Sequence, residues 1–86
     1  LVENCDAAFA LPGGIGTLLE ICLTWNQMLI NAIEPKPLIL IGEPWRNVIN
    51  AFFDELSDYV SEKNRKYISF APDPKSAVDL FMKYKK

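Results

Sequence analysis

The stretch "LPGGIGTLLE" (Leu11 to Glu20) decides how this chain is interpreted, because three glycines within four residues separate an apolar run from a helical pattern. Upstream, the unbroken apolar run "AAFAL" (residues 7–11) predicts a short strand covered on both faces, as in a parallel sheet. Pro12 and the glycines end that strand. Downstream, apolar residues dominate from about Thr17 to Ala32. A sharp strand-to-helix turn is therefore expected between the two elements.

The same order of apolar run, turn and helical pattern occurs twice more along the chain. The runs "PLILIG" (residues 37–42) and "YISFA" (residues 67–71) predict two further strands, stopped by glycine and proline. Three successive strand–helix units predict an α/β fold with parallel strands and right-handed crossovers. In such sheets ligands bind beyond the carboxyl ends of the strands. The loops that meet at that edge would be residues 12–16, 42–44 and 71–73.

The three expected helices differ in their apolar faces. The first is apolar on nearly all sides, which predicts burial almost all round. The second runs from Trp45 to Lys63 with one apolar face, and Asn64 fits a left-handed cap at its end. Its expected core residues include Trp45, Phe52 and Phe53. The third begins with Asp73 as N-cap and Pro74 as its first residue, and it is expected to turn inward Ala77, Val78 and Phe81.

The composition is that of a globular chain without a general affinity for polyanions or membranes. The 86 residues suffice for one domain at most, half of them are hydrophobic, and the formal net charge is −2. Basic clusters at residues 63–66 and 83–86 fall at expected helix ends, where cations complement the helix dipole, so no nucleic-acid partner is expected. No apolar run approaches the roughly 20 residues of a membrane span, so no membrane partner is expected either.

The two cysteines, Cys5 and Cys22, lie among apolar neighbours and lack the spacing of metal ligands, and the chain has no histidine. We therefore expect two buried, reduced thiols, a cytoplasmic protein and no metal site. The sequence begins with leucine and has no basic segment typical of a signal peptide. It is expected to start inside a longer polypeptide.

The glycines of the turn, Gly13, Gly14 and Gly16, give it the features of an anion site. Glycine allows positive φ and places no Cβ between the backbone and a ligand. The turn opens into a helix N-terminus, whose unpaired N–H groups attract phosphate, and the Thr17 hydroxyl adds a donor. A tight turn without a ligand explains the same glycines, and both interpretations stay open. The P-loop and the dinucleotide fingerprint are excluded, since no lysine lies near the turn and Leu19 stands where the third glycine would be.

Glu20 also has two interpretations. The segment from Thr17 to Glu20 fits the capping box S/T-x-x-E, in which the glutamate side chain binds the N–H of the N-cap threonine. Alternatively, the carboxylate lies beside a bound phosphosugar as an acid, a base or a stabiliser of positive charge. The two roles do not exclude each other.

The longer stretch "DAAFALPGGIGTLLE" (residues 6–20) resembles the signature P-G-G-x-G-T-x-x-E of the Lonely Guy family. Every fixed position is present: Pro12, Gly13, Gly14, Gly16, Thr17 and Glu20. On the same expected helix, "TWNQ" (residues 24–27) is similar to the family's W-x-Q. "PKP" (residues 35–37) is similar to the K-P entry to the family's next strand.

The resemblance implies a Rossmann-like fold, usually dimeric or larger, and a phosphoribohydrolase activity. In that activity water cleaves the N-glycosidic bond of a nucleoside 5′-monophosphate, such as AMP or a cytokinin riboside monophosphate, into free base and ribose 5-phosphate. By the resemblance Glu20 is the catalytic carboxylate, and the 5′-phosphate is held by Gly13, Gly14, Gly16 and Thr17. Family members also carry the label lysine decarboxylase, but nothing in this sequence suggests a pyridoxal phosphate site, and no cofactor is expected.

The chain departs from the family pattern in two ways. Many members have two adjacent glutamates at the helix start, whereas Leu19 precedes Glu20 here. The family's N-terminal half, with a second glycine-rich loop and a catalytic arginine in an R-K pair, is missing, and both arginines present, Arg46 and Arg65, follow the glycine turn. We therefore expect residues 1–86 to be the C-terminal portion of one larger Rossmann-like domain and to be inactive alone.

Two other functions remain open. Some relatives with this fold carry or sense a phosphorylated ligand, such as molybdenum cofactor. A binding protein of that kind would keep the phosphate loop and use Glu20 only as a cap. In the third hypothesis the chain is chiefly an assembly surface, whose apolar first helix packs against its twin in a dimer. Burial against the missing half of the domain explains the same apolar residues, which include Trp25, Met28 and Leu29.

Overall fold

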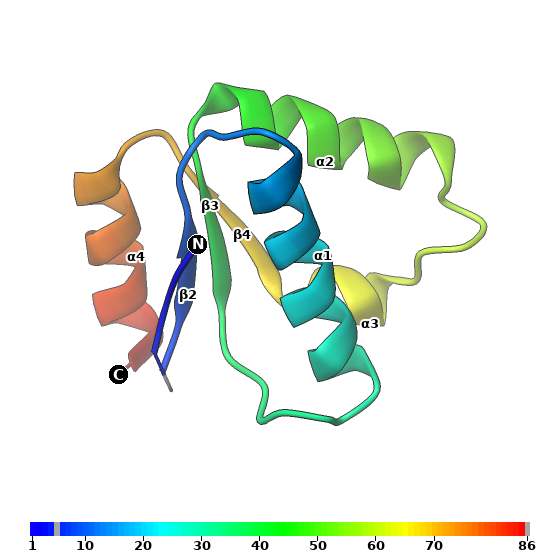
Figure 1. Ribbon diagram of the computed structural model, residues 1–86, viewed down its shortest axis with the longest axis horizontal. Helices are drawn as coiled ribbons and strands as arrows, with labels where there is room; N and C mark the ends of the chain where they lie inside the picture. Colours follow the sequence, from blue (N-terminus) through cyan, green and yellow to red (C-terminus); the bar gives the residue numbers. More distant parts are fainter. Residues whose placement is uncertain (5, 86) are drawn as a thin grey trace.

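In the computed structural model, which describes residues 1–4 and 6–85, one four-stranded sheet lies between two layers of helices (Figure 1). Helices α1, α2 and α3 cover one face of the sheet, and α4 covers the other. The strands are β1 (Val2–Glu3), β2 (Ala8–Ala10), β3 (Leu38–Ile41) and β4 (Ile68–Ala71). The helices are α1 (Ile15–Leu29), α2 (Glu43–Glu55), α3 (Glu62–Arg65) and α4 (Pro74–Lys85).

The sheet has the order β1-β2-β3-β4, and its three longer strands are parallel as the sequence predicts. Ala8 pairs with Leu38, and Leu38 pairs with Ile68, so the three carboxyl ends lie at one edge. The two-residue strand β1 adds an antiparallel edge that the sequence pattern does not predict. The buried Lys36 holds β1 in place, because its Nζ donates to the Asn4 carbonyl oxygen at 2.8 Å and also pairs with the Glu3 carboxylate.

The core has two parts because alternate residues of the central strand β3 point to opposite faces. Leu38 and Leu40 pack with residues of α1 and α2, whereas Ile39 and Ile41 pack with residues of α4. All four are buried. This two-sided burial explains why β3 is an unbroken apolar run rather than an alternating one.

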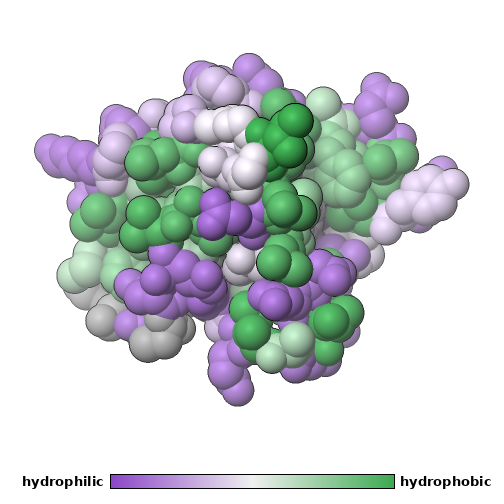
Figure 2. Space-filling view, viewed as in Figure 1, coloured by the Kyte–Doolittle hydropathy of each residue, from purple (hydrophilic) through white to green (hydrophobic). Residues whose placement is uncertain are grey.

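Helix α1 begins at Ile15, two residues before the predicted start, because Gly14 serves as its N-cap. The expected burial all round is wrong. Ile15 is 86% exposed, Leu19 64% and Leu23 54%, although Ile21, Thr24, Trp25 and Met28 are buried. The sheet and α2 cover only one side of this helix, and Figure 2 shows hydrophobic side chains along its outer side.

The predicted second helix is also wrong in length, since α2 ends at Glu55 and a turn separates it from α3. Thirteen helical residues already span about 20 Å, whereas the four residues of β3 span about 13 Å, so a longer helix would project past the core. Tyr59 is 82% exposed, and the chain turns back to bury Val60. Asn64 lies inside α3 and has no left-handed conformation; among the described non-glycine residues, positive φ occurs at Asn31 (61°).

Helix α4 starts as predicted, with Asp73 accepting a hydrogen bond from the Ser76 amide at 2.7 Å. That bond favours the ionised carboxylate and lowers the pKa of Asp73. Ala77 is buried and Phe81 packs against the core, but Val78 is exposed, contrary to the prediction. The expected burial of Cys22 is wrong as well, since this free thiol is exposed, while Cys5 lies outside the described residues.

Candidate functional site

The glycine turn lies at the carboxyl edge of the sheet, between the end of β2 and the start of α1 (Figure 1). The amide of Leu18 donates to the carbonyl of Gly14 at 3.0 Å and closes the first turn of the helix. The amides of Ile15, Gly16 and Thr17 precede that bond, so helix geometry gives them no partner within α1. Their N–H groups and the positive end of the helix dipole together suit an anion.

The glycines of the turn are not explained by positive φ, which was one of the expected reasons for them. Among the described glycines only Gly42 has positive φ, at 104°. A Cβ on Gly13 would lie 2.4 Å from the Thr17 Oγ1, so Gly13 leaves room for that hydroxyl. A Cβ on Gly14 or Gly16 would meet no described atom within 4 Å. These two glycines border open space at the start of the helix, and no internal contact requires them.

Glu20 does not complete a capping box. The N-cap of α1 is Gly14, without a side-chain cap bond, and Thr17 is the third helical residue. The Glu20 side chain is 53% exposed. Because Gly16 and Glu20 are four residues apart, they share one face of α1, and a helical side chain leans toward the helix N-terminus. The carboxylate therefore belongs to the same side of α1 as the open space beside Gly16. Its Oε1 lies 3.5 Å from the backbone nitrogen of Leu1, so the first residue of β1's segment lies next to the Glu20 carboxylate.

The first turn of α2 lies against the glycine turn, at the edge where the loops 12–16 and 42–44 were predicted to meet, but the hydrogen bond that joins them was not predicted. The indole Nε1 of Trp45 donates to the carbonyl of Leu11 at 2.8 Å. Gly42 approaches Pro12 so closely that a Cβ on it would lie 3.0 Å from the proline Cγ. Trp45 and Phe53 were expected in the core on their spacing alone, and both are buried, whereas the same expectation for Phe52 is wrong, since it is 38% exposed.

The guanidinium groups of both arginines lie over aromatic rings. Arg65 stacks its guanidinium 4.8 Å above the Phe53 ring and pairs with Glu62, in a helix at the far end of the sheet from the glycine turn (Figure 1). Arg46 holds its guanidinium 5.6 Å from the centre of the Phe70 ring.

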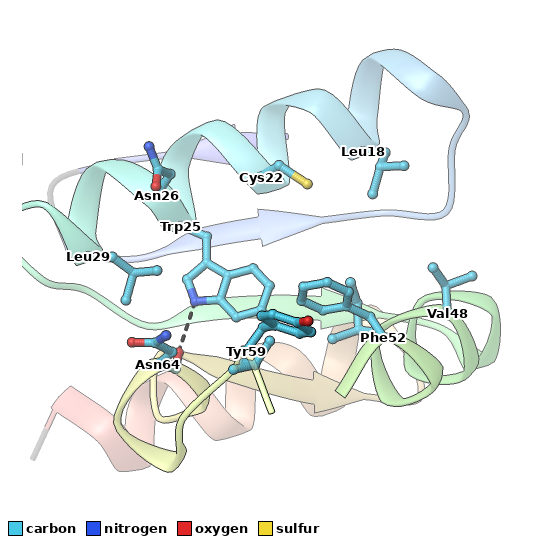
Figure 3. A pocket seen from close by; sticks show the side chains of 11 residues that line it. Leu18, Cys22, Trp25, Asn26, Leu29, Val48, Phe52, Tyr59 and Asn64 are labelled. Atoms are coloured by element: carbon cyan, nitrogen blue, oxygen red, sulfur yellow. Dashed lines mark hydrogen bonds between the residues drawn. The ribbon is translucent and has the colours of Figure 1, made fainter. Parts of the chain in front are cut away.

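An apolar groove of about 490 Å³ runs between α1 and α2 (Figure 3). At one end lies Leu18, next to the glycine turn, and further along Trp25 donates its indole N–H to the Asn64 carbonyl at 2.9 Å. Its lining is mostly hydrophobic and so does not suit a phosphate. The lining residues are Leu18, Cys22, Trp25, Asn26, Leu29, Val48, Ile49, Phe52, Tyr59, Val60 and Asn64.

Comparison with known proteins adds a family to this geometry. A family model described as "Possible lysine decarboxylase" matches residues 1–81. The chain belongs to this family. It is 34% identical over 89 residues to the cytokinin riboside 5′-monophosphate phosphoribohydrolase LOG7 of Arabidopsis thaliana, covering 98% of this chain and 40% of that protein. The "Probable cytokinin riboside 5′-monophosphate phosphoribohydrolase LOGL6" of Oryza sativa subsp. japonica is 32% identical, with 98% of this chain and 34% of that protein covered.

These relatives confirm the predicted resemblance to the Lonely Guy family. The chain spans about two fifths of the length of LOG7 and of LOG1, another Arabidopsis thaliana phosphoribohydrolase, which is 34% identical. The glycine turn and Glu20 lie inside the region matched by the family model. No solved structure matches the chain significantly.

Two further observations concern metals and membranes. Within residues 1–4 and 6–85, no three histidine, cysteine, aspartate or glutamate side chains come together as metal ligands. No helix in that part of the chain combines the length and the hydrophobicity required to cross a bilayer.

Proposed function

We propose that this chain belongs to a nucleoside 5′-monophosphate phosphoribohydrolase of the cytokinin-activating type. The relatives carry the name of that activity, and the motif of the glycine turn is complete. The observation that carries the proposal is the pair Gly14 and Gly16. A glycine inside a helix costs about 0.5–1 kcal/mol relative to alanine, yet no described contact requires one at Gly16. Close approach of a ligand to the backbone supplies the missing reason.

In the proposed reaction the start of α1 binds the 5′-phosphate. Gly13, Gly14 and Gly16 let the phosphate approach the backbone, and the amides of the first turn and the Thr17 hydroxyl donate hydrogen bonds to it. This anchoring places the ribose along the face of α1 that carries Glu20. The proposed site needs no cofactor.

Glu20 then acts on the glycosidic carbon. As the bond from C1′ to the base nitrogen breaks, positive charge develops on the ribose ring, as in glycoside hydrolysis. The Glu20 carboxylate stabilises that charge and orients the attacking water. The water oxygen bonds to C1′ and loses one proton, while the base nitrogen keeps the electron pair of the broken bond and gains one proton, so that ribose 5-phosphate and the neutral base are released.

We also propose that residues 1–86 form the C-terminal portion of one nucleotide-binding domain and are inactive alone. The chain covers two fifths of its phosphoribohydrolase relatives, and Leu1 lies beside Glu20. Any residues preceding Leu1 would enter the structure next to this carboxylate. Free base released by the isolated chain would contradict this proposal.

The exposed apolar side of α1 supports a further part of the proposal, a dimer or larger homo-oligomer. Ile15, Leu19 and Leu23 are largely exposed on this helix, and Figure 2 shows hydrophobic surface along the outer side of α1. Contiguous exposed apolar surface is typical of a protein interface. We place the protein in the cytoplasm, where the exposed Cys22 thiol remains reduced.

The test offers AMP and a cytokinin riboside monophosphate to the full-length protein and follows free base by chromatography. Release of base and ribose 5-phosphate in equal amounts supports the hydrolase. If neither nucleotide is cleaved and both raise the melting temperature, the protein is a carrier of phosphorylated ligands. If neither is cleaved or bound, the glycine turn is only a turn.

A further inference from the structure

The start of the glycine turn is held from α2 by a buried indole. Trp45 is 5% exposed, and its Nε1 donates to the Leu11 carbonyl at 2.8 Å across 34 residues of sequence. Leu11 lies beyond Ala10, the last residue of β2, so its carbonyl falls outside the strand pairing with β3. The indole thus supplies the hydrogen bond where the sheet no longer does.

A second contact fixes the neighbouring residue, Pro12. The Gly42 amide donates to the Ala71 carbonyl at 2.8 Å, which locks Gly42 to β4. With φ at 104°, Gly42 lies so near Pro12 that even a methyl group would come within 3.0 Å of the proline Cγ. Consecutive residues at the start of the turn, Leu11 and Pro12, are therefore both held by the segment that opens α2.

We propose that Trp45 is a positioning residue for the phosphate site. This inference rests on the proposed function, in which the amides at the start of α1 bind the 5′-phosphate. A Cβ on Gly14 or Gly16 would meet no described atom within 4 Å, so no packing on that side fixes the direction of those amides. Binding sites need their donors held within roughly 0.5 Å of the productive geometry. The hydrogen bond from Trp45 supplies part of that constraint through the backbone at Leu11.

The chain contains a matched control. Trp25 is also buried, at 7% exposure, and it also donates its indole N–H to a distant backbone carbonyl, that of Asn64 at 2.9 Å. Its bond joins α1 to α3 at the other end of the helix layer (Figure 3). Replacing either tryptophan by phenylalanine removes one hydrogen bond of the same kind and keeps an aromatic ring. The two variants are thus expected to lose similar stability.

The experiment compares wild type, Trp45→Phe and Trp25→Phe in the full-length protein. Binding of ribose 5-phosphate is measured by calorimetry, and hydrogen exchange is measured at the amides of residues 13–17 without ligand. For Trp45→Phe we expect a Kd raised about five- to tenfold and exchange accelerated at the turn, the size of effect that follows from one lost hydrogen bond. For Trp25→Phe we expect the Kd and the exchange rates to stay within about twofold of wild type, which is less than the effect of losing one hydrogen bond at the site.

Each remaining outcome has one meaning. If Trp45→Phe binds ribose 5-phosphate as tightly as Trp25→Phe does, the positioning role is wrong while the phosphate site stands. If wild type does not bind ribose 5-phosphate at all, the proposed function fails, and a positioning role toward that ligand fails with it. If hydrogen exchange at residues 13–17 were still faster in Trp45→Phe alone, the bond from Trp45 would stabilise the turn without any role in binding this ligand.

Discussion

Replacing Gly16 by alanine should move stability and phosphate binding in opposite directions. Gly16 is the second residue of α1, and a Cβ there would meet no described atom within 4 Å. Alanine therefore fits without strain and adds about 0.5–1 kcal/mol to the free energy of unfolding. For a protein of about 150–250 residues this raises the melting temperature by roughly 1–4 °C.

The same methyl group would occupy the space through which the phosphate approaches. Losing one hydrogen bond between a backbone amide and a charged oxygen costs about 1.5–3 kcal/mol, which raises the Kd for ribose 5-phosphate roughly ten- to hundredfold. The assay pairs a melting curve without ligand with calorimetric titration of ribose 5-phosphate. Asn50→Ala is the control, because Asn50 is exposed within α2 and alanine there stabilises a helix away from the turn. A Gly16→Ala variant that is more stable and binds as wild type does would refute the phosphate site.

Three further substitutions test the supporting structure. Gly42→Ala should lower the free energy of unfolding by about 1–3 kcal/mol in urea titrations, because alanine is strained at this φ and crowds Pro12; a loss below about 0.5 kcal/mol would contradict the close packing. The pKa of Asp73 is lowered by the Ser76 amide, so its cap is intact above the ordinary carboxyl pKa and weakens as the pH falls through the lowered value. Asp73→Asn, which caps the helix without titrating, should melt as wild type does at pH 7 but lose less stability between pH 5 and pH 2. If stability falls equally with pH in the two proteins, the Asp73 cap is not the titrating group. Leu23→Lys should shift the full-length protein to smaller species in light scattering without unfolding it, and an unchanged mass would exclude this face of α1 from the interface.

Much of the fold follows from the sequence because the strands are unbroken apolar runs. The apolar run at β3 fits a central strand of a parallel sheet better than any other element. Both the position of β3 and the parallel direction of its pairing were predicted. The end of α2 was not predictable, since apolar spacing continues through Val60 while the helix has already reached the length of the core. The sequence predicted that α1 is covered but not by what, because an apolar helix looks the same in sequence whether its own chain or a partner covers it.

The motif predicts which residues form the candidate site, but it does not predict the contacts that hold them in place. Gly14 rather than Thr17 caps α1, and the helix includes Ile15 and Gly16 although glycine is a poor helix former. The bond from Trp45 to Leu11 depends on how α2 crosses the end of β2, and spacing within α2 says only that Trp45 is buried. Tertiary crossings of this kind carry no local signal.

The central claim is that Glu20 is a catalytic carboxylate beside a phosphate-binding turn. The most direct test is Glu20→Gln in the full-length protein, with base release from AMP and a cytokinin riboside monophosphate measured alongside a melting curve. The control is Glu55→Gln, the same change at an exposed site at the end of α2. The account predicts that Glu20→Gln melts normally and still binds ribose 5-phosphate but releases at least about 100-fold less base, as expected when a charge that stabilises the transition state is removed. It predicts that Glu55→Gln stays fully active. Base release by Glu20→Gln at the wild-type rate would contradict it.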